Sequence, residues 1–399
     1  MKPIVIIGTG LAGYTVAREF RKLDKDTPLT IVTADAGGFY SKPMLSNAFA
    51  LNKLPEQLIN QSGAQMAEQL SATLIAHTPV IAVDAVRGIV VTDKGELEYG
   101  KLVLATGAHP IQLQLKGNAA QEVLSVNNID DYAAFRARID APENARPVRV
   151  AILGAGLIGC EFADDLAGAG HAVTLIDPGT RPLAALAAPA LSEGLQQALT
   201  ARGVRFHLNT VAESVERLDT DLQLQLADGG TVEADVVLSA VGLRPDLHLA
   251  TSAGLATGRG IVVDPCGRTS APDVYALGDC AEYTMPHGGT RTLPYIAPIL
   301  PAGRAIARTL AGEPTAIEMK DMPVLVKTPS HPIALVAPAP HVVGSGSWRT
   351  ETRGAQHICR FFDANGVMAG FGVSPHDNAI RQALLGELGK TADEIAPAG

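Results

Sequence analysis

Residues 154–162 read Gly-Ala-Gly-Leu-Ile-Gly-Cys-Glu-Phe and connect an apolar run, residues 148–153, to a segment with apolar residues at helical spacing. The pattern predicts a glycine turn between a buried strand and a helix. Such a turn presents backbone N–H groups and a helix N-terminus to a pyrophosphate. Alone, one glycine turn is weak evidence for a nucleotide site.

The same pattern occurs near the N-terminus, where residues 8–13 read Gly-Thr-Gly-Leu-Ala-Gly. A short apolar strand precedes this turn, and an amphipathic helix and a second strand at 29–33 follow it, which together make a βαβ unit. Asp35 lies 22 residues beyond Gly13, close to where an acidic side chain binds ribose hydroxyls. The acid of a second strand is usually the last strand residue or its neighbour, so Asp35 is a plausible candidate that stands one place late.

The two turns begin copies of one longer pattern. Gly8 and Gly107 are 99 residues apart, and Gly154 and Gly242 are 88 residues apart. Both intervals run glycine turn, helix, strand, β meander, strand and Ala-x-Gly turn. An internal repeat with two phosphate turns predicts two dinucleotide sites.

An acidic residue in the second copy bears on the choice of nucleotide. Asp177 closes the predicted strand 172–176, 18 residues after Gly159. A carboxylate there accepts hydrogen bonds from both ribose hydroxyls and repels a 2′-phosphate, which favours NADH over NADPH. Arg181, four residues further on, weakens that preference.

Three further segments carry candidate polar groups. Residues 269–279 predict a strand that leads to Gly278 and Asp279, where the carboxylate either binds a polyol chain or caps the next helix. Lys42, in a loop, either contacts a phosphate or is a solvated lysine. Residues 294–298 open a helix whose N-terminus would stabilise negative charge on a reduced ring system.

Composition excludes several classes of function. The net charge of −9 argues against nucleic-acid binding, and no run is long enough to span a membrane, so we expect a soluble, cytoplasmic protein. The four cysteines form no short pair, and buried free thiols are the simplest interpretation. No histidine has metal-ligand spacing and there is no serine nucleophile elbow, so no metal site is predicted.

Five segments in order resemble the flavoprotein pyridine nucleotide reductases with two dinucleotide-binding folds: residues 8–13, 105–107, 154–161, 240–245 and 269–279. The resemblance implies an α/β protein with two Rossmann-like domains of three-layer ββα type. It also implies an FAD-binding domain, residues 1–112 and 243–318, that is interrupted by an NAD(H)-binding domain, residues 113–242. Residues 319–399, with short strands and a helix near 379–388, are expected to form a small α+β interface domain.

The disulfide reductases of this superfamily carry a cysteine pair after one glycine turn, whereas here only Cys160 is present. The ferredoxin-reductase-like branch is therefore favoured, in which a hydride enters and single electrons leave. Residues 8–14, 40–46 and 326–329 resemble the rubredoxin reductases of alkane-degrading bacteria. This resemblance implies FAD and NADH as cofactors and rubredoxin, an acidic iron protein, as acceptor in an alkane hydroxylase chain.

Alternative functions stay open at this point. The flavorubredoxin reductases share much of the pattern, including a lysine in the same late strand. The first alternative is therefore an NADH-dependent reductase whose acceptor is flavorubredoxin or a ferredoxin. A flavoprotein that senses redox state and turns over slowly is a third possibility, disfavoured because the chain has no extra interaction segment.

One departure from the family directs attention to Lys327. Many reductases of this branch have a lysine near flavin N5 at the position of Asn47, which cannot supply a charge. In the rubredoxin reductases the lysine comes from the late strand, here Lys327. We therefore expect Glu161 and Lys327 to pair at N5, the lysine stabilising the anionic reduced flavin. The alternative to this pairing is that Glu161 lies on the surface of its helix and Lys327 on the surface of its strand.

The resemblance also implies the remaining cofactor contacts, residue by residue. Those expected for FAD are Gly8, Thr9, Gly10, Leu11, Ala12, Gly13, Ala34, Asp35, Lys42, Pro43, Val80, Ala105, Thr106, Gly107, Gly278, Asp279, Ile296 and Lys327. Those expected for the nicotinamide nucleotide are Gly154, Gly156, Leu157, Ile158, Gly159, Glu161, Asp177 and Gly242.

Overall fold

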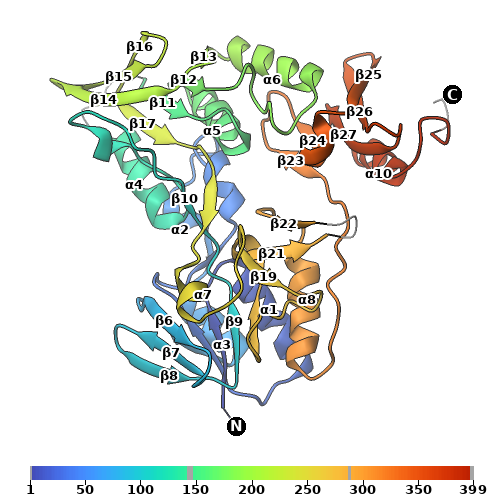
Figure 1. Cartoon of the computed structure of the whole chain (residues 1–399). Helices are drawn as coiled ribbons and strands as arrows, with labels where there is room; N and C mark the ends of the chain where they lie inside the picture. The colour runs from blue at the N-terminus through green and yellow to red at the C-terminus, as the bar shows by residue number, and fades with distance from the viewer. Residues whose placement is uncertain (1, 142–146, 286–288, 396–399) are drawn as a thin grey trace. The chain divides into compact units, whose positions relative to one another are not determined.

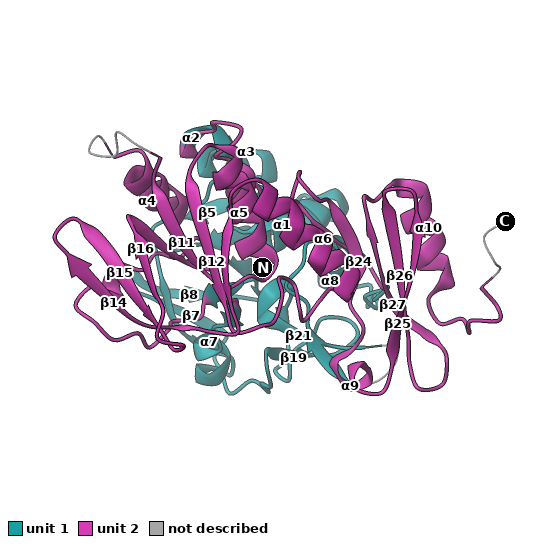
Figure 2. Cartoon of the chain, turned by 90° about the horizontal axis from the view of Figure 1, so that it is seen from above, with its two compact units in different colours: residues 1–42, 56–109, 243–320 teal, residues 43–55, 110–242, 321–399 magenta. Residues whose placement is uncertain are grey.

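The computed structural model describes residues 2–141, 147–285 and 289–395. The chain forms two compact units, coloured separately in Figure 2. The first comprises residues 1–42, 56–109 and 243–320, and the second comprises residues 43–55, 110–242 and 321–399. Figure 1 labels most of the helices and strands along the chain.

A parallel five-stranded sheet of order β20-β9-β1-β2-β5 forms the centre of the first unit. Its central strands are short apolar runs buried on both faces, as parallel strands covered by helices are. Its strands are β1 (Ile4–Ile7), β2 (Leu29–Val32), β5 (Thr73–Ile75), β9 (Lys101–Leu104) and β20 (Val274–Ala276).

Helices α1 and α8 pack closely in this unit. A Cβ added to Gly303 of α8 would lie 2.6 Å from the Thr15 side chain of α1, so the contact requires glycine. The helices of the unit are α1 (Leu11–Leu23), α3 (Gly63–Leu70), α7 (His248–Ser252) and α8 (Ile299–Leu310), and α2 (Pro55–Leu58) stands at its boundary. The small sheets contain β3 (Phe39–Tyr40), β4 (Ile59–Gln61), β6 (Val80–Asp84), β7 (Ile89–Thr92), β8 (Gly95–Glu98), β19 (Ile261–Val263), β21 (Ala281–Thr284) and β22 (Thr290–Thr292).

The second unit repeats this plan around a parallel sheet of order β13-β12-β11-β17, with the antiparallel meander β14-β15-β16 between β13 and β17 in the chain. Its strands are β11 (Arg149–Leu153), β12 (Ala172–Asp177), β13 (Arg205–Leu208), β14 (Ala212–Leu218), β15 (Asp221–Leu226), β16 (Thr231–Ala234) and β17 (Val236–Ser239). Its helices are α4 (Ile129–Ile139), α5 (Leu157–Gly168) and α6 (Pro189–Ala201). The chain passes between the units at β10 (Ala108–Pro110) and β18 (Leu243–Pro245).

The last part of the second unit is an antiparallel sheet of order β23-β24-β27-β26-β25 with its own apolar core. A Cβ on Gly372 of this sheet would lie 2.4 Å from Leu191, so the sheet packs tightly on α6. Its elements are β23 (Val324–Val326), β24 (Ile333–Val336), α9 (Pro340–Val343), β25 (Ser347–Arg353), β26 (Gln356–Phe362), β27 (Met368–Ser374) and α10 (Asn378–Glu387).

The predicted α/β class is correct, and three local predictions need adjustment. Helix α8 begins at Ile299, not at 294, because the residue before Pro298 is disfavoured in a helix. Lys327 lies one residue beyond the end of β23, not within a strand. In the C-terminal part the sequence predicts strands at 322–328, 333–336 and 356–362, and β25 and β27 lie outside these ranges. Among the described residues, no helix has the length and apolar character that crossing a bilayer needs.

Candidate functional site

The first glycine turn is shaped by close backbone approach. A Cβ on Gly8, which has φ +108°, would lie 2.3 Å from the Ala105 carbonyl oxygen, and one on Gly13 would lie 2.0 Å from the Gly8 oxygen. At Gly10, the N-cap of α1, an added Cβ meets no atom within 4 Å. Because no side chain caps this helix, its first backbone N–H groups are available to a ligand. The open space beside them fits a phosphate.

The second glycine turn has the same construction. A Cβ on Gly154 would lie 2.7 Å from the Ala240 oxygen, and one on Gly159 would lie 1.9 Å from the Gly154 oxygen. Gly156 is the N-cap of α5, without a side-chain cap, and a Cβ there again meets nothing within 4 Å. The second turn therefore fits a phosphate by the same test.

The two acidic residues near the ends of the second strands, Asp35 after β2 and Asp177 at the end of β12, each accept hydrogen bonds from the adjoining glycine turn. Asp35 accepts hydrogen bonds at Oδ1 from the hydroxyls of Thr9 (3.1 Å) and Thr33 (2.8 Å) and from a backbone N–H. Asp177 accepts the Ala155 N–H at Oδ2 and the Gly179 N–H at Oδ1, both at 2.6 Å. Each carboxylate thus fixes the loop that would surround a ribose.

Asp279 lies in the 3-10 turn after β20, and burial raises the pKa of its carboxyl group while the charge of Lys42 opposes that shift. The two residues therefore lie near each other, as expected if both serve one polar ligand. A Cβ on Gly278 would lie 2.9 Å from the Ala12 side chain, which brings this turn beside the start of α1. Ile296 precedes α8 and is exposed.

The structure thus gathers most of the predicted flavin residues at the carboxyl ends of β1, β2, β9 and β20, where open α/β sheets bind ligands. Val80 starts β6 in the same unit. The predicted nicotinamide residues Gly154 to Glu161, Asp177 and Gly242 lie at the corresponding ends of β11, β12 and β17. Pro43 and Lys327, predicted for the flavin, belong to the second unit.

Glu161 and Lys327 form an ion pair within the second unit. The Lys327 Nζ lies 2.8 Å from Glu161 Oε2, and the Lys327 backbone N–H donates to Glu161 Oε1 at 2.9 Å. Glu161 is fully buried, whereas the lysine side chain is 35% exposed. The carboxylate therefore binds both the backbone N–H and the ammonium group of one lysine, and part of the lysine side chain stays exposed.

Three residues of loop 43–55 complete the surroundings of this lysine, and the sequence did not single them out as its partners. The Ser46 hydroxyl donates to Glu161 Oε2 at 2.6 Å and accepts from Lys327 Nζ at 3.2 Å. Lys327 Nζ also donates to the Pro43 carbonyl and to Asn47 Oδ1, and the Asn47 amide donates to the Lys327 carbonyl. Asn47 therefore helps to fix the position of the Lys327 ammonium group.

All four cysteines are free thiols. Burial raises the pKa of Cys160 far above its ordinary value, and its Sγ donates to the Ala155 carbonyl. Burial also raises the pKa of the Cys280 and Cys359 thiols, whereas Cys266 is only partly buried. The buried thiols are protonated at neutral pH, so none of them is poised as a nucleophile.

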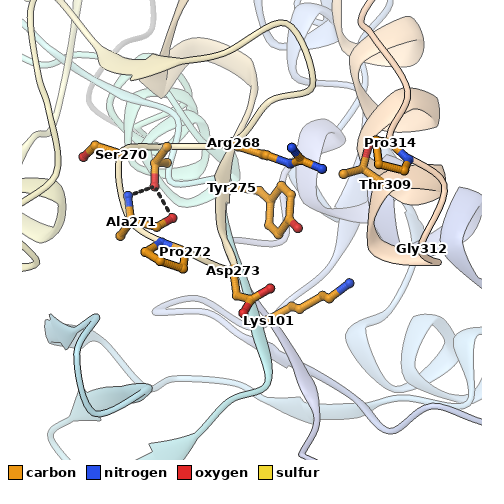
Figure 3. A pocket seen from close by; sticks show the side chains of 11 residues that line it. Lys101, Arg268, Ser270, Ala271, Pro272, Asp273, Tyr275, Thr309, Gly312 and Pro314 are labelled. Atoms are coloured by element: carbon orange, nitrogen blue, oxygen red, sulfur yellow. Dashed lines mark hydrogen bonds between the residues drawn. The ribbon is translucent and has the colours of Figure 1, made fainter.

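A hollow of about 440 Å³ lies elsewhere in the first unit (Figure 3). It is lined by Lys101 and Asp273, at the amino ends of β9 and β20, and by Arg268 and Tyr275. Lys101 donates to the Leu310 carbonyl at the end of α8. This hollow lies at the strand ends opposite to those that carry the glycine turn, so it is separate from the predicted cofactor residues.

Comparison with known proteins agrees with this arrangement. The family model described as "Pyridine nucleotide-disulphide oxidoreductase" matches residues 2–296, and the one described as "Rubredoxin binding C-terminal domain" matches residues 316–388. Rubredoxin-NAD(+) reductases of Alcanivorax borkumensis and Acinetobacter baylyi are each 42% identical to the chain, with the whole of both chains covered. A nitric oxide reductase FlRd-NAD(+) reductase of Aeromonas hydrophila is 38% identical over 97% of the chain and 96% of its own length.

Solved structures share the fold. Putidaredoxin reductase, in its covalent complex with putidaredoxin, superposes with a TM-score of 0.87 at 24% identity, covering 99% of this chain and 96% of that one. A ferredoxin reductase from Rhodopseudomonas palustris gives the same TM-score and identity, covering 100% and 98%. The predicted resemblance and the predicted fold class are both confirmed.

Proposed function

Because the chain belongs to the pyridine nucleotide-disulphide oxidoreductase family, we propose that it is an FAD-dependent NADH:rubredoxin oxidoreductase. In the overall reaction, one NADH reduces two molecules of a one-electron acceptor and releases NAD⁺ and one proton. Bound FAD supplies the conversion of a hydride into single electrons. The protein's task is to bind both nucleotides and to control charge where the hydride arrives.

The single observation that carries the proposal is the pair of uncapped glycine turns with open space at Gly10 and Gly156. Each turn would hold a pyrophosphate on a helix N-terminus. Asp35 and Asp177 would each take a ribose, and Asp177 would disfavour a 2′-phosphate. The FAD domain is proposed to span residues 1–112 and 243–318, the NAD(H) domain 113–242 and the interface domain 319–399.

Glu161 and Lys327 are proposed to act at the N5 edge of the flavin. The ammonium group of Lys327 would stabilise the negative charge that hydride arrival brings, and the Glu161 carboxylate would fix that ammonium group. The cage of Ser46, Asn47 and the Pro43 carbonyl supports this role because it holds the lysine in one position before any ligand binds. A flexible surface lysine would have to be ordered first, at a cost in entropy.

The cysteines support direct exit of electrons from the flavin. A disulfide relay needs a neighbouring thiol pair, and α5 carries only Cys160, whose thiol is buried and protonated. Electrons therefore leave without a thiol intermediate, as delivery to an iron protein requires. We place the enzyme in the cytoplasm, in the electron chain of an alkane hydroxylase.

The test is anaerobic stopped-flow reduction of the purified holoenzyme by NADH, followed by mixing with rubredoxin, a ferredoxin or oxygen. We expect flavin reduction by NADH and reoxidation fastest with rubredoxin, with NADPH a poor donor. Reoxidation that is equally slow with all acceptors would contradict the proposal. A flavorubredoxin belongs in the same series, because the FlRd-NAD(+) reductase of Aeromonas hydrophila, at 38% identity, is nearly as similar to this chain.

A further inference from the structure

Helix α5 carries two buried carboxylates one turn after Glu161, at Asp164 and Asp165. The spacing of three and four residues places all three acids on neighbouring positions of one helix face. Asp164 and Asp165 are 1% and 4% exposed, an unusual position for acidic side chains unless they have specific partners. Their partners are the two segments that surround Lys327.

Asp165 holds loop 43–55. Its two carboxylate oxygens accept the consecutive backbone N–H groups of Phe49 (2.8 Å) and Ala50 (2.9 Å). Just before Phe49 in the loop are Ser46 and Asn47, which contact the lysine ammonium group. The helix thus binds the loop at one point through Asp165 and at another through Glu161.

Asp164 holds the chain just beyond Lys327. Its Oδ2 accepts the Ser330 N–H at 3.0 Å, and Arg202 of the same unit lies 3.3 Å from its Oδ1. The turn from Thr328 to His331 is closed by two further hydrogen bonds, so a carboxylate at Ser330 fixes the backbone that carries Lys327.

We propose that Asp164 and Asp165 are positioning residues that hold Lys327 in place, Asp165 through loop 43–55 and Asp164 through the turn after the lysine. This inference rests on the proposed role of Lys327 in hydride transfer. Neither aspartate touches a cofactor in this scheme. Each acts on hydride transfer through Lys327, and a displacement of about 1 Å at such a group slows a reaction by as much as 100-fold.

The decisive experiment combines a double-mutant cycle of hydride transfer, measured by anaerobic stopped flow on FAD-loaded protein, with amide hydrogen exchange at Phe49 and Ala50, whose N–H groups Asp165 binds. Exchange at these two amides should speed up in Asp165→Asn and stay unchanged in the control variant, and unchanged exchange in Asp165→Asn would contradict the inference. Asp165→Asn retains one acceptor oxygen but turns an amide N–H₂ toward the second backbone N–H, so the loop loses one of its two bonds. We expect hydride transfer from NADH to slow about tenfold. In the Lys327→Met background we expect no further slowing by Asp165→Asn, because the group that it positions is gone.

Tyr132→Phe is the matched control. It removes one hydrogen bond to the far end of the same loop, from the Tyr132 hydroxyl to the Lys53 carbonyl at 3.1 Å, and keeps the ring contact with Phe49. Hydride transfer should be unchanged in this variant. Asp164→Asn tests the second arm, with the same expected loss of effect in the Lys327→Met background.

Each outcome has a separate meaning. If Lys327→Met alone leaves hydride transfer unchanged, the proposed role of the lysine fails. Suppose that Lys327→Met slows the reaction. If Asp165→Asn then slows hydride transfer by the same factor with and without Lys327, or does not slow it at all, the positioning inference fails while the role of the lysine stands. If Asp165→Asn does not accumulate with bound FAD, Asp165→Glu, which keeps the charge, takes its place in the same cycle, and its effect on the rate is interpreted in the same way.

Discussion

Replacement of Lys327 by Met is the most direct test of how this enzyme controls charge. The substitution removes an ammonium group 2.8 Å from Glu161 and leaves a fully buried carboxylate without its counter-ion. The carboxylate keeps the Ser46 hydroxyl and the Lys327 backbone N–H as donors. Two effects therefore have to be separated, one on stability and one on the reaction.

The stability effect follows from the burial of the pair. Removing one partner of a fully buried pair costs about 3–5 kcal/mol in free energy of unfolding. Here about 2 kcal/mol is expected, because the lysine side chain is partly exposed and Glu161 retains two hydrogen bonds. The kinetic effect is the loss of one fixed positive charge, which slows hydride transfer by about 10²–10³, or raises the barrier by about 3–4 kcal/mol.

The assay is anaerobic stopped flow with NADH, following flavin absorbance, on protein whose FAD content equals that of the native enzyme. Chemical unfolding of the same preparations gives the stability effect. The double variant Glu161→Gln/Lys327→Met removes both charges, so we expect it to recover most of the stability and none of the rate. Native hydride transfer in Lys327→Met, or a recovered rate in the double variant, would refute the reasoning.

Three further predictions concern the glycine turn of α5, the ribose acid and a buried carboxylate. Gly156→Ala should fold normally but raise KM for NADH in steady-state kinetics, because its methyl group enters the open space at the helix N-terminus. Gly159→Ala should instead unfold at a lower urea concentration, because its Cβ would lie 1.9 Å from a carbonyl oxygen. Asp177→Asn should lower the ratio of kcat/KM for NADH to that for NADPH by about tenfold, since a neutral amide no longer repels a 2′-phosphate. Burial raises the pKa of Asp165 from 3.8 to about 6, so the folded state binds this proton more tightly than the unfolded state, and the free energy of unfolding should fall as the pH rises from about 4 to about 6. The shift corresponds to about 3 kcal/mol, and Asp165→Asn should remove this part of the pH dependence in urea titrations.

The sequence predicted the local parts of the site and not the long-range ones. The glycine turns could be predicted because close backbone approach requires glycine at fixed spacings, and the structure shows those approaches at Gly8 and Gly154. The pairing of Glu161 with Lys327 rested on resemblance, since the two residues are 166 positions apart. Ser46 lies 115 positions from Glu161, and no local pattern indicates that contact.

Two strands escaped prediction for a similar reason. Strand β25, with sequence Ser-Trp-Arg-Thr-Glu-Thr-Arg, is an exposed edge strand and lacks the alternation of apolar residues that indicates a half-buried strand. Strand β27 contains two glycines, which weaken any strand pattern. Both form because β26 supplies hydrogen bonds and an apolar face, which are properties of the folded sheet and not of the segments themselves.

The spacing of Asp164 and Asp165 after Glu161 is a local sequence signal for the anchoring of loop 43–55.

The energetics of Asp165 also bear on its role. An ionised Asp165 is kept buried at neutral pH, where its raised pKa means that it lowers the stability of the fold. An asparagine would avoid that loss, but it offers a single acceptor oxygen to two consecutive N–H groups, and one unpaired buried N–H costs about 1–3 kcal/mol. The two costs nearly cancel, so stability alone does not favour the carboxylate. What the carboxylate adds is a loop held at two points, and hence a fixed Lys327, so Asp165→Asn should change the rate of hydride transfer far more than it changes stability near neutral pH.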